Sequence, residues 1–474
     1  MEINSTDPKG SVPFLALGFL LVFAPLFLGG NRPQPLMVLE LVAIAGLASL
    51  AWQGFSRVHF RSLPSALLWG AGLLVVVPLL QLVPLPAGLW SQLPGHGPYY
   101  RALEFAGDAA TQAWRPASLH PRATEYSWLV ILPCIAAFLL VLAQSQSQLK
   151  RLVTVFVAVA VCEAVLGVLQ LGAAPGSPLY LGNVHGGGAA TGTYVNKNHY
   201  AALMAMALPM AVAVWFINAM PQQRNHSGNN RPHHRVTDRT LAIRIALSVL
   251  VLFLLVALLF SLSRGGIGSG LLAFALASLA LIWKAATIPA RIAFGFVGLA
   301  SLALAAYIGL TPVLERLTPD QLSLGFEGRA QIALASFRAA LDFLPLGSGL
   351  GTYADAFRRY QVEGLPGFVD HAHNDYAELF LELGVAGVAI AALLGGAYLM
   401  RWAQLLPAWR QHALGYLQVA AGIGMLAMLV HAWADFNFHI PANAIYFSFL
   451  AGVFFFTPHW EEQGLTPPSA APHA

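Results

Sequence analysis

One short polar stretch holds the residues with the clearest chemical potential. Val369 to Gly384 reads V-D-H-A-H-N-D-Y-A-E-L-F-L-E-L-G, and the apolar run Val385 to Met400 follows it directly. Ionisable groups at a membrane edge are costly, and such groups mark functional sites more often than they mark structural ones. The stretch is therefore the first candidate for a catalytic site.

His373 is the residue in this stretch best suited to proton transfer. It precedes an expected helix start, where Asn374 and Asp375 are available to cap the helix. An imidazole titrates near neutral pH and can take a proton from a hydroxyl group. We interpret His373 as a general base, and the pattern leaves open that His371 is the base or shares a hydrogen-bond network with it.

Metal binding is the rival interpretation of the same stretch. His371 and His373 form an H-x-H pair that Asp370 and Asp375 could complete as ligands. No separate D-x-D carboxylate pair stands nearby to build a divalent-cation and diphosphate site, so we expect no metal.

Two acidic residues follow on the helix that enters the apolar run. Glu378 and Glu382 stand at positions i and i+4 and line one face of that helix. We expect both to be hydrogen-bonded at the helix end, with contacts to a sugar acceptor as the alternative.

Cationic side chains fall near three other apolar runs. Arg264, in S-L-S-R-G-G, sits in so short a connection that its guanidinium must stay close to the bilayer edge. A rigid charged fork there suits a phosphate oxyanion, and the alternative is an arginine that reaches lipid head groups. Arg329 and Lys197 add two cations on the same side. Lys197 lies between Asn196 and Asn198 at an expected helix start, where amide donors and the helix dipole favour an anion.

The polar groups at helix ends gather on one side of the membrane in the expected topology. His431, Asp435, Asn437 and His439 precede Pro441 and could orient the principal histidine or bind sugar hydroxyls. The five polar groups are Thr191–Tyr200, Ser261–Gly266, Glu327–Arg329, His371–Tyr376 and His431–Asn443. A random distribution of polar residues would be split between the two faces, so this gathering predicts one site.

The composition of the chain indicates the kind of fold that positions these residues. The 474 residues are 57% hydrophobic and 10% charged, with a mean hydropathy of +0.65, whereas a soluble domain carries about 25% charged residues. We expect an all-α, polytopic membrane bundle of about twelve transmembrane helices, because apolar runs near the necessary ~20 residues recur along the chain. These runs cover 12–30, 35–55, 64–83, 125–143, 152–172, 199–219, 245–261, 267–284, 292–310, 384–405, 416–434 and 442–457.

The basic residues set the expected orientation. With a cytoplasmic N-terminus, residues such as Lys150, Arg151, Arg244 and Arg401 fall on the cytoplasmic side, as the positive-inside rule requires. The sequence then divides into residues 1–310 with nine membrane helices, a large outward loop domain at 311–383, three helices over 384–460, and a disordered cytoplasmic tail at 461–474. Within the loop domain we expect an amphipathic helix over Glu327–Phe343 and a second short helix over Thr352–Gln361, which carries Arg358.

Taken together, these motifs resemble the O-antigen ligase and polymerase family of bacterial envelope enzymes. The resemblance rests on S-R-G-G, on G-R before an amphipathic helix and P-L-G-S-G-L-G, and on H-A-H-N-D-Y-A-E-L-F-L-E-L-G-V-A-G. T-G-T-Y-V-N-K-N-H-Y is similar to the family's motif between its fifth and sixth helices. The similarity covers about Thr191 to Asn443.

The resemblance implies an inner-membrane glycosyltransferase of the GT-C type that acts in lipopolysaccharide assembly. Such an enzyme takes a glycan from undecaprenyl diphosphate on the periplasmic face and passes it to an acceptor hydroxyl with inversion, without a cofactor or an obligatory metal. Ligation to lipid A–core is the expected reaction, and a polymerase or a protein O-oligosaccharyltransferase of the same family is the alternative. Membrane lipids are expected partners and nucleic acid is not.

The resemblance also implies roles for individual residues. The family's essential arginines match Arg264 and Arg329, and its essential histidine matches His373. The residues expected to contact donor or acceptor are Lys197, Asn196, Asn198, His199, His371, Asn374, Asp375, Arg358, His431 and Asp435. A transporter is the competing class, which predicts ionisable residues near mid-bilayer and broken helices in symmetric halves. Glu40 and Glu163 are isolated candidates for such buried charges. The polar groups gather on one face beside a large one-sided loop, which favours an enzyme.

Overall fold

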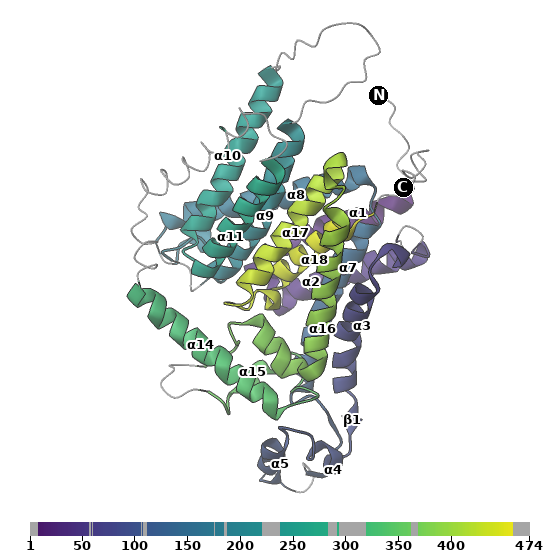
Figure 1. The fold of residues 1–474 in the computed structure, drawn as a ribbon. Coiled ribbons are helices and arrows are strands. Elements are labelled where there is room, and N and C mark those ends of the chain that lie inside the picture. The colour runs from purple at the N-terminus through teal and green to yellow at the C-terminus, as the bar shows by residue number, and fades with distance from the viewer. Residues whose placement is uncertain are drawn as a thin grey trace, which may run out of the picture.

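The chain folds as a bundle of α-helices with a smaller helical region at one end (Figure 1). The structure, a computed structural model, describes residues 8–55, 58, 60–105, 107, 111–174, 176–183, 187–219, 238–282, 292, 319–361 and 368–457. Within these ranges, seven helices are long and apolar enough to cross a membrane. Four shorter apolar helices accompany them. The expected all-α fold with several membrane-spanning helices is confirmed, and the expected total of about twelve membrane crossings remains a prediction.

The bundle helices agree with the apolar runs of the sequence. They are α1 (Pro8–Phe23), α2 (Pro33–Trp52), α3 (Ser65–Gln81), α7 (Pro121–Leu142), α8 (Gln146–Leu171), α9 (Lys197–Ala219), α10 (Asp238–Phe260), α11 (Arg264–Ala277), α16 (Asp375–Leu405), α17 (Ala413–His431) and α18 (Pro441–Phe455). A π-helical turn, Ser278–Ile282, extends α11. Eleven of the twelve expected runs thus contain a helix, and the expected run 292–310 and the tail 461–474 lie outside the described residues, apart from Ile292.

The region beyond the bundle combines two segments that are distant in sequence. It contains α4 (Ala87–Trp90), α5 (Gly97–Glu104), α14 (Pro319–Asp342) and α15 (Tyr353–Phe357). A two-stranded antiparallel pair, β1 (Pro84–Leu85) and β2 (Arg115–Pro116), closes the first segment. Figure 1 shows α14 and α15 below the bundle, at the end where α16 begins, with α4 and α5 beyond them. Short 3₁₀ turns complete the described elements: Leu28–Gly30, Phe60–Ser62, Pro178–Tyr180, Trp409–Gln411 and Asn437–His439.

Two clusters of buried apolar side chains pack the helices of the bundle and of the smaller region together. The larger cluster fills the bundle around α9 and α17, which pack on each other and on α11. The smaller one joins α14, α15 and the first turns of α16 through side chains that include Ala339, Phe343, Tyr353, Phe357 and Leu381. This second cluster fixes the loop that carries His371 and His373, because Ala372 lies fully buried within it.

Helix α16 begins earlier than the apolar run predicts. It starts at Asp375 and runs to Leu405, with a kink at Gly384, where φ is 56° and ψ is −134°. A side chain at Gly384 would overlap the carbonyl oxygen of Pro345, so glycine is needed for both conformation and space. The expected division between residues 383 and 384 therefore falls on this kink, inside one helix.

Candidate functional site

The candidate site is built where six helix ends meet on one side of the bundle. The starts of α9, α11, α16 and α18 and the ends of α10 and α17 come together there. Asp375 N donates to Ala432 O at 2.9 Å, and Asn443 Nδ2 donates to His199 O at 3.0 Å. These bonds join α16 to the end of α17, and α18 to the start of α9. Polar groups that are distant in sequence thus share one neighbourhood.

Asp435 is the hub of the first group of side chains, which we call the Asp435 group: Asp435, His199, His373 and Arg329. Its carboxylate is fully buried. Oδ1 lies 3.5 Å from His373 Nδ1 and 4.0 Å from His199 Nε2, and Oδ2 lies 3.8 Å from Arg329 Nη1. Arg329 also donates from Nη1 to Ala434 O at 2.7 Å. One buried anion therefore brings an imidazole and a guanidinium to the same place.

The electrostatics of this group favour an ionised Asp435. Burial alone works to raise the pKa of its carboxyl, but the contacts with His373 and His199 and the charge of Arg329 outweigh burial. The pKa of Asp435 consequently lies well below its ordinary value. The ring of His373 therefore faces a carboxylate that favours its charged form.

His373 itself has an unusual backbone. Its φ is +47°, in the left-handed region that costs an L-residue about 1–2 kcal/mol. The next residue, Asn374, caps α16 as expected, because its Oδ1 accepts from Tyr376 N at 3.1 Å and from Ala377 N at 3.0 Å. The cap and the buried Ala372 on the other side hold His373 in this conformation, which aims its ring at Asp435.

Arg264 stands at the start of α11, next to the same group. Ser263 caps this helix by accepting from Gly266 N at 3.2 Å, and the preceding Leu262 is left-handed with φ +53°. A Cβ added at Gly265 would lie 2.8 Å from His431 Cδ2 and 3.7 Å from Ala434 Cβ. The two glycines thus let the backbone beside Arg264 pack against the end of α17, where Arg329 is also bound.

The start of α9 carries the N-K-N-H residues. Lys197 is its first residue, and Asn196 Oδ1 accepts from Asn198 N at 2.9 Å. Asn198 and His199 are buried. The loop before them is held by Glu163 of α8, whose carboxylate accepts from Thr193 N at 2.8 Å and from Thr193 Oγ1 at 2.7 Å. The isolated buried acid of the sequence thus has a partner within the bundle.

Several buried polar atoms around the Asp435 group have no hydrogen-bond partner among the described residues. They include His199 Nε2, His431 Nδ1, Asn443 Oδ1 and both side-chain amide atoms of Asn437. Buried polar atoms are nearly always paired, so each unpaired one calls for an explanation. The concentration of such atoms here makes this neighbourhood the candidate site for polar contacts with a ligand.

A second group of ionisable residues lies on the other side of Phe436; we call it the His439 group: His371, Asp375, Glu378 and His439. His371 Nδ1 is 2.8 Å from Glu378 Oε1, His439 Nε2 is 3.1 Å from the same oxygen, and His439 Nδ1 is 3.0 Å from Asp375 Oδ1. Burial works to lower the pKa of His439, but the charges of Glu378 and Asp375 raise it to about 10. The two carboxylates thus favour positive charge on the His439 ring between them.

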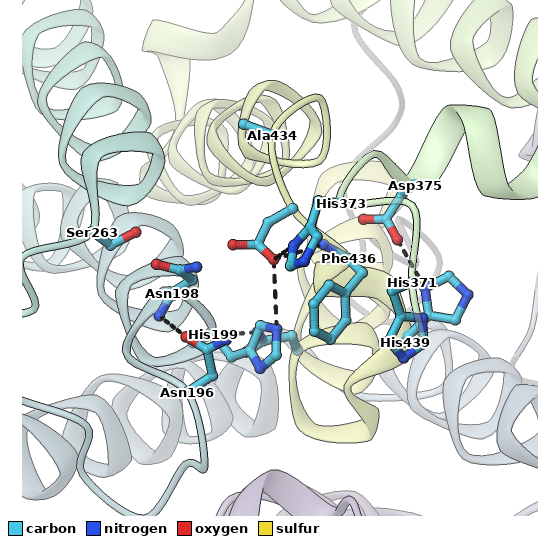
Figure 2. Close-up of polar contacts among 12 residues, drawn as sticks. Asn196, Asn198, His199, Ser263, His371, His373, Asp375, Ala434, Phe436 and His439 are labelled. Atoms are coloured by element: carbon cyan, nitrogen blue, oxygen red, sulfur yellow. Dashed lines mark hydrogen bonds and ion pairs between the residues drawn. The ribbon is translucent and has the colours of Figure 1, made fainter. Parts of the chain in front are cut away.

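The ring of Phe436 separates the two groups. It stacks on His371 at 4.1 Å between centroids and meets His373 and His199 edge-on at 5.1 Å and 4.7 Å (Figure 2). His371 and His373, two residues apart, therefore join different networks. The hydrogen-bonded role expected for Glu378 holds, and Glu382 likewise accepts from Tyr353 N at 2.9 Å.

Arg358 is the one expected site residue that the structure places with a different set of side chains. Its guanidinium lies 4.9 Å above the ring of Phe368. It lines a cavity of about 360 Å³ with Tyr99, Leu119, His120, Asp355 and Arg359. The remaining expected residues fall in the Asp435 group, the His439 group or the helix ends beside them.

Sequence reasoning gave little weight to Phe436 and His439. Both stand in the run His431–Asn443, whose D-F-N-F-H pattern signals a polar turn but does not say which ring points where.

Comparison with known proteins gives one family match, to the central part of the chain. Residues 249–392 match the family model described as O-antigen ligase, and no curated protein matches the chain. The matched region includes Arg264, Arg329, His371 and His373, while the N-K-N-H residues and Asp435 lie outside it. The resemblance expected from the motifs is thus confirmed over its central part, and the chain is a multi-pass membrane protein that contains a domain of the O-antigen ligase family.

Proposed function

We propose that this protein is an inverting glycosyltransferase that moves a glycan from undecaprenyl diphosphate to an acceptor hydroxyl. The reaction we favour is ligation of O-antigen to lipid A–core. The observation that carries the proposal is the meeting of His373 and Arg329, both inside the region that matches the O-antigen ligase model, with Asp435 beside the start of the Arg264 helix.

A lipid-linked diphosphate must leave its isoprenoid in the bilayer and its charged group at the boundary. Arg264, Arg329 and Lys197 stand at the ends or beside the ends of apolar helices, where such a diphosphate would lie. Their positive charges would stabilise the negative charge that develops on the leaving diphosphate. The helix start at Lys197 adds backbone N–H groups that favour an anion.

In the proposed step His373 removes the proton from the acceptor hydroxyl. The oxygen then attacks the anomeric carbon from the face opposite the diphosphate, the bond to the diphosphate oxygen breaks, and the configuration inverts. Asp435 would orient His373 and stabilise its protonated ring, as the aspartate does in serine-protease triads. The step as written uses no metal ion, because the cationic side chains neutralise the leaving group.

The remaining expected residues would contact the substrates. We assign Asn196, Asn198, His199 and His431 to the donor, because they line the same helix ends as the cations. His371, Asn374 and Asp375 would act through the loop that holds the base. Arg358 and Arg359 face the separate cavity, which would suit anionic groups of the acceptor.

The orientation of the chain follows from its basic residues. Lys150 and Arg151 stand in the first turns of α8, and Arg401 donates to the carbonyl oxygens of Phe454 and Phe456 at the end of α18. The site lies at the opposite ends of α8 and α18. By the positive-inside rule we place the basic end in the cytoplasm and the site in the periplasm of a bacterial inner membrane.

The decisive experiment supplies the purified protein in liposomes with undecaprenyl-diphosphate-linked glycan. Lipid A–core, a second lipid-linked glycan and an acceptor protein are offered in separate reactions. We expect glycosylated lipid A–core, and a loss of product in Arg264→Ala, Arg329→Ala and His373→Ala. Product only from the second glycan or the protein would assign the family's other reactions, and transfer unaffected in all three variants would refute the site.

A further inference from the structure

The His439 group has the geometry of a metal-binding site. Glu378 Oε1 lies 2.8 Å from His371 Nδ1 and 3.1 Å from His439 Nε2, and all three atoms lie within 4.8 Å of one another. Zn²⁺ binds imidazole nitrogen and carboxylate oxygen at about 2.0–2.2 Å, and two histidines with one glutamate are a known three-residue ligand set for it. Small side-chain rotations would open the space that a cation needs between these atoms.

The groups around the three ligand atoms are arranged as they are in metal sites. Asp375 Oδ1 lies 3.0 Å from His439 Nδ1, so once the ring gives up a proton to a cation, Nδ1 would keep its hydrogen on Asp375 and Nε2 would be the nitrogen that binds the cation. Ala372 N donates to Glu378 Oε2 at 2.9 Å, so the other oxygen, Oε1, is turned toward the two histidines. Each of these two ligands is thus oriented by a contact that does not compete for the cation.

The charges of the group call for a cation. Glu378 and Asp375 are 1% and 7% exposed, and among the described residues their ion pairs are with imidazoles alone. Burying two carboxylates is costly unless positive charge compensates them. A divalent cation supplies that compensation at one point between the residues.

The group is also accessible. The side chains of His371 and His439 are 26% and 29% exposed, so an ion has a path of entry and a remaining coordination position can hold water. Phe436 separates the group from His373, so a cation here would not touch the groups that transfer the proton.

We propose that His371, Glu378 and His439 bind a divalent transition-metal ion of the zinc class, which ties the start of α16 to the turn between α17 and α18. The ion would hold the loop on which His373 lies. This site is independent of the proposed glycan transfer, because its test measures metal and not product.

The test uses the full-length protein in detergent with a purification tag that lacks histidine. His226, His233 and His234 are replaced by alanine throughout, so that the histidine-rich segment 226–234 does not bind the probe. Elemental analysis measures bound zinc after dialysis against Zn²⁺, and visible absorption spectra after loading with Co²⁺ report the ligand set. We expect about one equivalent of zinc per chain.

Variants separate the ligands from their neighbours. His371→Ala and His439→Ala should lose the bound ion, and Asp375→Asn should weaken binding about 10- to 100-fold without abolishing it. His120→Ala is the matched control, because His120 is paired with Asp355 at 2.7 Å outside this group and should leave the zinc content unchanged. If His439→Ala does not fold, the partly exposed His371 provides the test alone.

The proposal fails if the background protein binds neither Zn²⁺ nor Co²⁺ after loading. It also fails if His371→Ala retains the metal content of the background protein. In either case the two carboxylates are compensated by a proton on His439.

Discussion

Replacing Asp435 by asparagine tests the central feature of the proposed mechanism. The Asp435→Asn change keeps the shape of the side chain and removes its charge. At 3.5 Å and an effective dielectric constant of 20, the attraction between this carboxylate and a protonated His373 is about 5 kcal/mol. The side chains of His373 and Arg329 are 25% and 39% exposed, so solvent screening reduces the value. We take about 2–3 kcal/mol, which corresponds to a rate loss of about 30- to 150-fold.

The assay is the initial rate of transfer in liposomes at saturating donor and acceptor, with folding checked by thermal unfolding in detergent. Asp342→Asn is the matched control, because it makes the same chemical change at an exposed aspartate, which accepts from Tyr360 Oη at 2.7 Å and lies outside both groups and outside the Arg358 cavity. It should keep the rate within about twofold of wild type, since surface pairs contribute little. A folded Asp435→Asn protein with a rate within about threefold of wild type, or an equal loss in the control, would refute the reasoning.

Four further outcomes follow from the same geometry. Arg264→Ala should lower kcat by about 10²–10³-fold, and Arg264→Lys should retain part of the rate because it keeps the charge but cannot make two parallel hydrogen bonds; a wild-type rate in Arg264→Lys would exclude a bidentate role. His373→Asn and His373→Ala should both lose transfer by about 10²–10⁴-fold, but Asn tolerates a left-handed backbone, so a lower melting temperature is expected for the alanine variant only. Gly266→Ala should destabilise the chain by about 1–3 kcal/mol because its Cβ would overlap a side chain of α9, whereas Gly268→Ala, with open space around it, should not; thermal unfolding of both decides this. Because the pKa of Asp435 is lowered in the folded state, its ionised carboxyl stabilises the fold at pH values above the unfolded-state pKa of about 3.9. The difference in melting temperature between wild type and Asp435→Asn should therefore shrink as the pH falls from about 6 to about 3. A difference that stays constant over this range would contradict the lowered pKa.

Hydropathy was sufficient to predict the bundle, because length and apolar composition alone decide which segments can span a bilayer. It placed eleven helices. The start of α16 lies before the apolar run, because residues 375–383 are polar on one face and pack on α14 and α15 instead of lipid, and it was the expected cap at Asn374 that located this start. The N-cap of α16 was likewise predictable, because asparagine is among the residue types that cap helices and this preference depends on local sequence alone.

The sequence did not predict that His371 would join the His439 group while His373 joins the Asp435 group. His371 and His373 have similar neighbours in sequence, and only the left-handed backbone at His373 and the ring of Phe436, far along the chain, send them to different partners. The position of Arg358 was unpredictable for the same reason. It follows a five-residue helix, α15, that packs against α14 and α16, so its surroundings depend on tertiary contacts.

The aromatic ring between the imidazoles has a consequence for how mutational effects combine. Among the described residues, no side-chain hydrogen bond or ion pair joins the Asp435 group to the His439 group across Phe436, so the side chains of one group act on those of the other through ring contacts and longer-range charge. Free-energy penalties of paired substitutions should therefore sum when the pair straddles the ring, as for His439 with Asp435, and depart from the sum when both members lie on one side, as for Asp435 with Arg329. Substitutions in the His439 group would thus change how the loop before α16 is held, and substitutions in the Asp435 group would change the reactivity of His373, with little cross-effect between the two.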